Sequence, residues 1–263
     1  DNSDNRAGEH VLRGVWTTRP DPAHTVELGL EGAYNYRRVN RESLSGPIGG
    51  PFAPVAVPVA STKVEEDRIE ASINDVWRMS PQFTLEAGFN YEASTISQSG
   101  DANRSEDFTY SKPRLVANWT PTAEDQFRLS FVRDVSQLDF GDFATGLNSI
   151  SNSANIGNPL LVPEQTWKSS LQWKRPLGPR GSLSITAFYD DIEDTQDFIN
   201  AQDLAASGIV VPPFCVSPEP AAALCTAVGN VGDCTRWGAR VEATLPLDMI
   251  GIGGGLLKVN AGW

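Results

Sequence analysis

The sequence has no apolar run long enough for a membrane-spanning helix, which needs about 20 residues. Its two longest uncharged segments are residues 43–62, which contain four prolines, and residues 143–163, which are rich in Ser, Asn and Gly. The mean hydropathy of −0.28 also argues against a bundle of spanning helices. It does not argue against a membrane β-barrel, because barrel strands are apolar on one side only.

Basic residues are also in short supply. The chain has 21 Lys and Arg against 33 Asp and Glu, a net charge of −12. A general nucleic-acid binder needs a basic face for phosphate groups. We therefore expect no nucleic-acid partner.

Residues for catalysis and for metal binding are scarce. The two histidines are His10 and His24, and no HExxH, CxxC or GxSxG motif is present. The glycines at 251 and 253–255 lack the GK[ST] that a phosphate-binding loop requires. We expect two surface histidines, a flexible glycine turn, no catalytic residues, no metal, no cofactor, and a protein that is not an enzyme.

Both ends of the sequence lack the usual boundary signals. The chain begins with a polar Asp-Asn-Ser-Asp-Asn segment, without a start Met or a secretory signal, and it stops inside the alternating stretch 257–263. We therefore expect residues 1–263 to be one part of a longer protein.

What dominates the sequence is alternation with a period of two. In residues 83–92, for example, Phe, Leu, Ala, Phe and Tyr alternate with Thr, Glu, Gly, Asn and Glu. A β-strand places successive side chains on opposite faces, so such a segment has one apolar and one polar face. This pattern predicts ten strands, near residues 10–18, 25–38, 64–78, 83–97, 108–120, 127–137, 166–175, 182–192, 236–246 and 256–263.

The predicted connections alternate in length. Short ones rich in Pro and Gly (19–24, 79–82, 121–126, 176–181, 247–255) take turns with long ones (39–63, 98–107, 138–165, 193–235). Short turns at one end and long loops at the other are typical of outer-membrane barrels. We therefore predict an all-β fold: an antiparallel up-and-down transmembrane β-barrel segment of about ten strands that forms an incomplete wall, although a secreted β-sandwich remains an alternative.

Aromatic residues flank the predicted short turns. Indole and phenyl side chains suit a membrane–water boundary, which favours an interface girdle; the alternative is that aromatic residues favour strand ends in any β-protein. The proposed girdle is Trp16, Trp77, Phe83, Trp119, Phe127 and Trp173. An opposite girdle near the long loops would contain Tyr36, Tyr91, Tyr110, Trp167, Tyr189 and Trp237.

The polar face would line the barrel interior. Its charges have mixed signs, which suggests cross-strand pairs rather than a filter of one sign. The candidates facing the lumen are Glu31, Arg37, Glu86, Asn90, Glu92, Arg114, Arg128, Lys168, Arg240 and Glu242. Some residues break the pattern: Asp75 and Arg133 fall on the apolar face, Val116 and Val132 fall on the polar face, and Pro113 predicts a bulge or a strand end inside its strand.

The three cysteines, Cys215, Cys225 and Cys234, all lie in the last long loop. Cysteines confined to a loop fit an oxidising compartment, where one disulfide would form. We favour Cys215–Cys225, and Cys225–Cys234 stays open. Residues 191–235 are also acidic and contain no Lys or Arg, which indicates a solvated loop or, as an alternative, a surface that attracts cations.

The segment GNPLLVPEQTW at residues 157–167 resembles the loop-to-strand segment of TonB-dependent outer-membrane receptors, where an NPxLxPE-like string precedes a strand. The stretch 112–135, a strand, a short turn and a strand, is similar to the barrel of that family. In this chain the x positions are the apolar Leu160 and Val162, where the family often has polar residues, and no plug domain or TonB box is visible.

This resemblance implies an outer-membrane location and TonB-coupled uptake of a scarce nutrient such as a ferric siderophore, a vitamin or an oligosaccharide. The implied partners are outer-membrane lipid, a plug domain, the remaining barrel strands, the TonB energy-coupling complex and an unidentified small-molecule substrate. A passive porin or an adhesive barrel is the alternative. Because unpaired strand edges are costly in lipid, the first and last strands must pair either with each other or with strands absent here, and we predict the second.

Overall fold

The computed structural model describes residues 2–46, 49–51, 53–55, 61–101, 103–148, 153–211, 215 and 225–263. One antiparallel sheet dominates it, and its ten long strands confirm the ten predicted ones. They are β1 (Asn2–Thr18), β2 (His24–Ser45), β4 (Ser61–Ser80), β5 (Phe83–Gly100), β6 (Arg104–Trp119), β7 (Gln126–Val135), β10 (Gln165–Leu177), β11 (Gly181–Glu193), β14 (Cys234–Pro246) and β15 (Leu256–Gly262). They neighbour one another in chain order, and a short strand, β3 (Ala53–Val55), pairs with the end of β2.

Several strands are longer than the alternating pattern predicted. The expected long connection 98–107 is wrong: β5 continues to Gly100 and β6 begins at Arg104, with the pairing unbroken up to Gln98 and Arg104. Residues 98–107 are almost all polar or charged and lack apolar alternation, so this part of the hairpin resembles a loop in the sequence. The ladder hydrogen bonds nevertheless continue through it.

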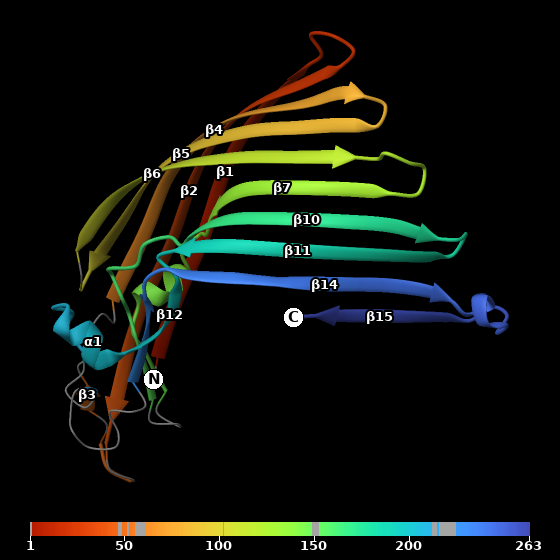
Figure 1. Ribbon diagram of the computed structural model, residues 1–263. Coiled ribbons are helices and arrows are strands. Elements are labelled where there is room, and N and C mark those ends of the chain that lie inside the picture. Colours follow the sequence, from red (N-terminus) through yellow and green to blue (C-terminus); the bar gives the residue numbers. More distant parts are fainter. Residues whose placement is uncertain are drawn as a thin grey trace.

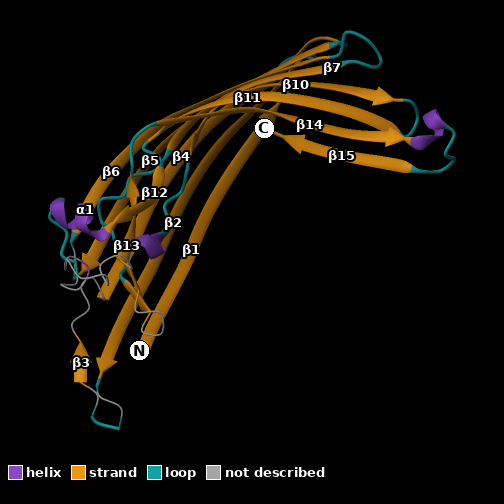
Figure 2. Cartoon of the chain, turned by 60° about the horizontal axis from the view of Figure 1, so that its bottom comes forward, coloured by secondary structure: helices purple, strands orange, loops and turns teal. Residues whose placement is uncertain are grey.

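The sheet is curved and open (Figures 1 and 2). β1 pairs only with β2, and β15 pairs only with β14, so the first and last strands do not close a barrel among the described residues. The architecture is thus an incomplete barrel wall with one free edge at each end. None of the described helices is long and apolar enough to cross a membrane.

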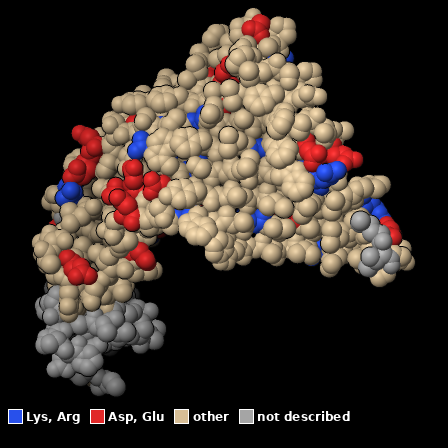
Figure 3. Space-filling model, viewed as in Figure 1, with Lys and Arg blue, Asp and Glu red and all other residues tan. Residues whose placement is uncertain are grey.

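The two faces of the sheet differ as the alternation predicted. The outer face, defined here as the face that carries Leu30, Leu129 and Leu171, leaves these side chains 51–57% exposed. No second layer covers these leucines, as it would in a β-sandwich. In the view of Figure 3 most of the central surface is uncharged, and many acidic and basic side chains lie toward the strand ends and loops.

A small second sheet, called the cap here, lies on the inner face. Its strand order is β12 (Gln196–Asn200), β13 (Cys225–Asn230), β9 (Ser153–Ile156) and β8 (Gly146–Asn148), and it is flanked by the 3-10 helix η1 (Phe140–Phe143) and the short helix α1 (Ala201–Ala206). A second 3-10 helix, η4 (Leu247–Ile250), lies in the turn between β14 and β15. The cap is built from two long connections that are distant in sequence and meet over one part of the wall.

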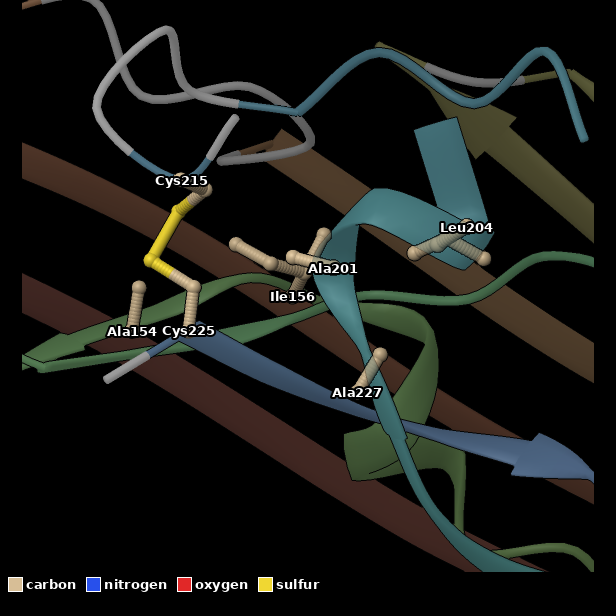
Figure 4. Close-up of a cluster of buried hydrophobic side chains, with 7 residues drawn as sticks. All are labelled: Ala154, Ile156, Ala201, Leu204, Cys215, Cys225 and Ala227. Carbon is tan, nitrogen blue, oxygen red and sulfur yellow. A yellow bond between two sulfur atoms is a disulfide. The ribbon is translucent and has the colours of Figure 1, made fainter. Parts of the chain in front are cut away.

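Two apolar clusters hold the cap together and on the wall. In the first, Ile156, Leu204 and Ala227 pack with the Cys215–Cys225 disulfide (Figure 4). In the second, Val64 and Ile96 on the wall pack against Leu138, Phe143 and Leu161. The inner face is therefore polar over most of its height but apolar where the cap rests.

Pro113 limits the pairing of β6 with only one of its two neighbouring strands. β6 continues through it without a register shift against β5, so neither the predicted bulge nor the predicted strand end occurs. The pairing of β6 with β7 begins only at Arg114. Because proline lacks an N–H donor, the ladder is interrupted on the β7 side.

Candidate functional site

The inner face of β2, β4 and β5 carries three carboxylates in one cross-strand row. Glu31 pairs in register with Glu70, and Glu70 pairs with Glu92. Neighbouring strands are about 4.8 Å apart, and like charges placed opposite one another repel. The row therefore requires cations from the adjacent rows.

Two basic residues supply that charge. From the row on one side, Arg68 donates from Nη2 to Glu31 Oε1 at 3.0 Å and places Nη1 at 3.6 Å from Glu92 Oε2. From the row on the other side, Lys112 Nζ bonds both Glu70 and Glu92, the latter at 2.7 Å. Asn90 Nδ2 adds a bond to Glu70 Oε1 at 2.9 Å.

Of this network the sequence predicted the inward position of Glu31, Asn90 and Glu92 but missed Arg68 and Lys112. Both have the same parity as their neighbours Glu70 and Arg114, so the alternation itself contained the signal. The structure groups three acids and two bases in a half-buried network that leaves one negative charge.

Other residues predicted to face the lumen also have partners on the inner face. Arg114 Nη2 lies 3.5 Å from Glu86 Oε2, Arg128 Nη1 donates to Asn118 Oδ1 at 2.9 Å, and Lys168 Nζ bonds Asp134 Oδ2 at 2.5 Å. Cross-strand pairing thus extends from β5 to β10.

Farther along the wall the pairing is less complete. Arg236 of β14 pairs with Asp190 of β11 at 2.7 Å, but among the described residues the side chains of Arg240 and Glu242 of β14, Lys174 of β10 and Lys258 of β15 make no hydrogen bond or ion pair. Lys174, Glu242 and Lys258 line a hollow of about 400 Å³ with Gln172 and Asn260. The predicted residues of β14 are therefore left outside the paired network.

Basic residues at the end of β2 attach the segment around η1. Arg37 Nη1 donates to Asp139 Oδ1 at 3.1 Å, and Arg41 Nη1 donates to the Thr145 carbonyl at 2.7 Å. Burial, followed by the charge of Asp139, raises the pKa of Asp142 in η1. Part of the cap is thus held against β2 by side-chain hydrogen bonds that no local sequence motif predicts.

The GNPLLVPE segment joins the two parts of the cap. Asn158 is buried, donates from Nδ2 to the Val228 carbonyl at 2.9 Å, and accepts from Leu160 N at 2.9 Å. In return, Asn230 Oδ1 accepts from Val162 N at 3.0 Å, and its Nδ2 donates to the carbonyl of Val162 at 3.0 Å. The segment therefore connects β13 to the connection that precedes β10.

The cysteines lie in the cap and at the start of β14. Cys215 and Cys225 form a disulfide with a Cα–Cα distance of 5.4 Å, while Cys234 is an exposed free thiol that accepts from Thr195 Oγ1 at 3.1 Å. Glu219 of the acidic loop lies outside the described residues. In the described part of the chain no group of three or more His, Cys, Asp or Glu could hold a metal ion.

The predicted girdle residues next to the short turns lie on the outer face. Four of them form a continuous cross-strand row, from Phe83 through Trp119 and Phe127 to Trp173. The rings of Trp119 and Phe127 are 5.5 Å apart. Trp16 and Trp77 also face outward, on β1 and β4. That this row marks a membrane boundary stays a prediction.

The opposite girdle contains one error. Tyr110 is directly opposite Glu92, so it points inward, and it is buried. The parity of β6 shows this, since Tyr110 shares a face with Lys112. Proximity to a strand end alone was a misleading criterion.

Polar residues on the outer face have specific partners. Asp75 Oδ2 bonds His24 Nδ1 at 2.7 Å, and the His24 ring stacks on Trp77 at 5.2 Å. Arg133 donates to Gln165 Oε1 at 2.6 Å and lies 5.4 Å from the Trp167 ring centre. Each exception to the apolar pattern is thus paired beside an indole ring.

A short turn on the outer face is bonded to a neighbouring strand. Asp125, between β6 and β7, accepts from Trp173 Nε1 and from Thr122 Oγ1, both at 3.0 Å. These two bonds lower the pKa of Asp125. Arg175 Nη2 bonds the adjacent Glu124 at 2.6 Å. The indole N–H of Trp173 therefore has a fixed acceptor at the turn end of the sheet.

Comparison with known proteins agrees with this architecture. The family model described as TonB dependent receptor-like, beta-barrel matches residues 2–262. No curated protein matches the chain.

Solved structures share the fold at low identity. The FrpB iron transporter from Neisseria meningitidis (F3-3 variant) is 11% identical with a TM-score of 0.57, over 98% of this chain and 35% of that one. The hemophore receptor HasR of Serratia marcescens, a double mutant in complex with its hemophore HasA and heme, is 11% identical with a TM-score of 0.62, over 92% and 40%. The alcaligin outer-membrane receptor FauA from Bordetella pertussis is 12% identical with a TM-score of 0.55, over 99% and 39%.

An open antiparallel wall with an apolar outer face, a charged inner face and long inward-folded loops has the architecture of part of a β-barrel wall. The chain belongs to the TonB dependent receptor-like beta-barrel family, whose members are outer-membrane proteins of bacteria. The family and these solved structures are transporters and receptors rather than enzymes. The chain spans 35–40% of the length of the three solved structures.

Proposed function

We propose that this chain is part of the wall of a bacterial outer-membrane active transporter. Such a receptor captures a scarce nutrient with its extracellular loops and imports it with TonB-coupled energy. The observation that carries the proposal is the family match over residues 2–262 on a wall whose long loops fold back over the inner face.

In this proposal the two faces have separate tasks. The outer face contacts lipid, and its Phe83–Trp173 row lies at the membrane boundary near the short turns, where aromatic rings are favoured. The inner face lines the lumen, where the paired charges of β2 to β6 contact water, a plug domain or substrate. Further strands of the parent protein would pair with the free edges of β1 and β15.

The cap is the part nearest to arriving solute. It lies at the long-loop end, it is fastened to the wall by Arg37 and Arg41, and a disulfide bonds Cys215 to Cys225 at the start of β13. A fold held at several points suits a binding surface, because a preorganised site loses less conformational entropy on binding.

The test is uptake by cells that express the parent receptor, with and without a functional TonB complex. Labelled ferric siderophore, vitamin and oligosaccharide are offered separately. We expect accumulation of one class only when the coupling complex works, with the receptor in the outer-membrane fraction. Accumulation that persists without coupling would instead support a passive porin.

A further inference from the structure

A second row of hydrogen-bond acceptors crosses the inner face, two rows from the Glu31–Glu70–Glu92 row. Glu9 of β1 pairs in register with Asn35 of β2, and Asn35 pairs with Glu66 of β4. Three neighbouring strands thus present a carboxylate, an amide and a carboxylate side by side. The row lines a hollow of about 430 Å³ whose other side is formed by Leu138, Asp139 and Phe140 of the η1 connection.

The basic residues next to this row are committed elsewhere. Arg37, one row away, bonds Asp139 at 3.1 Å and Asn5 at 3.3 Å. Arg68, one row away on the other side, directs its two terminal nitrogens toward Glu31 and Glu92. Each carboxylate of the first row is therefore paired with a protein cation, and those of the second row are not.

Acceptor atoms of the second row lack hydrogen-bond donors. Glu66 is 9% exposed, and its one hydrogen bond comes from Asn35 Nδ2 to Oε2 at 2.8 Å. Asn35 Oδ1 is shielded from solvent and has no hydrogen-bond partner among the described residues. Glu9 is exposed, and its side chain has neither an ion pair nor a hydrogen bond in the described part of the chain. Buried acceptors without donors are rare in native structures, and a bound ligand is one explanation for them.

We propose that this hollow is a subsite for a cationic group with N–H donors, such as an alkylammonium group of the transported solute. An ammonium group has three donors and no acceptor, which matches a row that offers acceptors only. Its charge offsets the hollow's excess of Glu9, Glu66 and Asp139 over Arg37. A metal ion fits less well, because two carboxylates on strands about 10 Å apart and one amide do not converge on a point.

Phe140 adds apolar surface to the same hollow. It suits the methylene chain of an alkylammonium group, and an aromatic face attracts a cation. The subsite lies at the long-loop end of the inner face, beside the cap. The inference rests on the proposed function, since it gives the chemical class of group that the transporter recognises.

The experiment uses the full-length receptor in detergent and measures binding of 1,4-diaminobutane by calorimetry. The neutral isostere 1,4-butanediol is the reference ligand. We expect the diamine to bind at least tenfold more tightly than the diol, and Glu66→Gln or Glu9→Gln to weaken diamine binding at least fivefold. Glu66→Gln keeps an acceptor for Asn35, and Glu9 lies on the edge strand, so both variants should fold.

Glu242→Gln is the matched control, because Glu242 is also an unpaired inner-face acid but lies outside this hollow. We expect it to leave diamine affinity unchanged. Equal effects of Glu242→Gln and Glu66→Gln, no diamine binding, or binding of Ca²⁺ in place of the diamine would each overturn the inference. If nutrient uptake depends on the coupling complex but the diamine does not bind, this inference is wrong and the proposed function stands. If the diamine binds but uptake needs no coupling, the proposed function is wrong and the subsite stands.

Discussion

The inner face of β2 to β6 and the short-turn half of the inner face of β10, β11, β14 and β15 have the same alternating pattern but differ in whether their charges are paired. In the first region Arg68 and Lys112 bridge three carboxylates that would otherwise repel one another. In the second, Lys174, Arg240, Glu242 and Lys258 have no partner among the described residues. Periodicity decides that a charge faces inward, whereas cross-strand register decides whether it meets an opposite charge.

The cap strengthens the difference. It packs on Val64 and Ile96 of β4 and β5, at the long-loop end of the paired region. In the unpaired region the charges line a hollow instead. A wall can therefore combine a rigid part whose charges pair with one another and a part whose charges gain partners only when something binds.

The largest effect should come from removing a charge of the paired region. Lys112→Met leaves Glu70 and Glu92 without their shared cation, and breaking a buried pair from one side costs about 3–5 kcal/mol. Because these side chains are 11–18% exposed, we expect the lower end of that range. Urea unfolding of the full-length receptor in liposomes measures the free energy of unfolding.

Lys258→Met is the matched control from the unpaired region. It should change the free energy of unfolding by less than about 0.5 kcal/mol, as surface substitutions usually do. Similar losses in both variants would contradict the contrast between the two regions.

A smaller effect is expected where the cap folds against itself. A Cβ atom at Gly157 would lie 2.4 Å from the Phe143 carbonyl oxygen, so Gly157→Ala must displace backbone. Such overpacking costs about 1–3 kcal/mol. Faster hydrogen exchange of β9 and β13 amides, with the wall strands unchanged, is the expected result.

Gly14→Ala provides the comparison for this variant, because nothing lies within 4 Å of a Cβ atom at Gly14. Its exchange rates should match those of the native receptor. If Gly157→Ala accelerates exchange in the wall strands β10, β11, β14 and β15 as strongly as in the cap, the cap and the wall are not independent.

The smallest effect concerns the turn beside the unpaired region. The pKa of Asp125 is lowered by its bonds from Trp173 and Thr122, so the charged form is favoured in the folded state. The contribution of ionised Asp125 to the free energy of unfolding is present above the unfolded-state pKa near 3.9. It is lost as the pH falls through the lower folded-state pKa. We expect the indole N–H resonance of Trp173 to shift below about pH 4.

In Asp125→Asn the Trp173 resonance should be insensitive to pH over the same window. The indole of Trp77, which lies beside His24 on another strand, serves as an internal reference. A Trp173 resonance that still titrates in this variant would show that another group controls it.

Much of the wall was predictable because the alternation of apolar and polar residues along a strand shows which residues face each environment. All ten strands followed from alternation, and Glu31, Asn90 and Glu92 were placed inward by parity. The errors came where that signal fades: the polar hairpin at 98–107 was taken for a loop, and Tyr110 was assigned by proximity instead of parity. Arg68 and Lys112 were missed although their parity was available.

The cap could not be predicted in this way. Its parallel pairing of β13 with β9 joins residues about 70 positions apart, and its attachment to β2 depends on Arg37 and Arg41 reaching a loop about 100 positions away. No local period records such contacts. The same holds for the hollow at Glu9, Asn35 and Glu66, since each strand shows only one of its acceptors.

The sequence by itself determined that this chain forms amphipathic antiparallel strands with one apolar and one polar face, because a period of two is a property of each strand alone. Only the tertiary structure decided which inward charges neutralise one another, where the long connections fold, and which acceptors stay unmatched. Those outcomes depend on register and on distances between strands, which arise when separate segments come together.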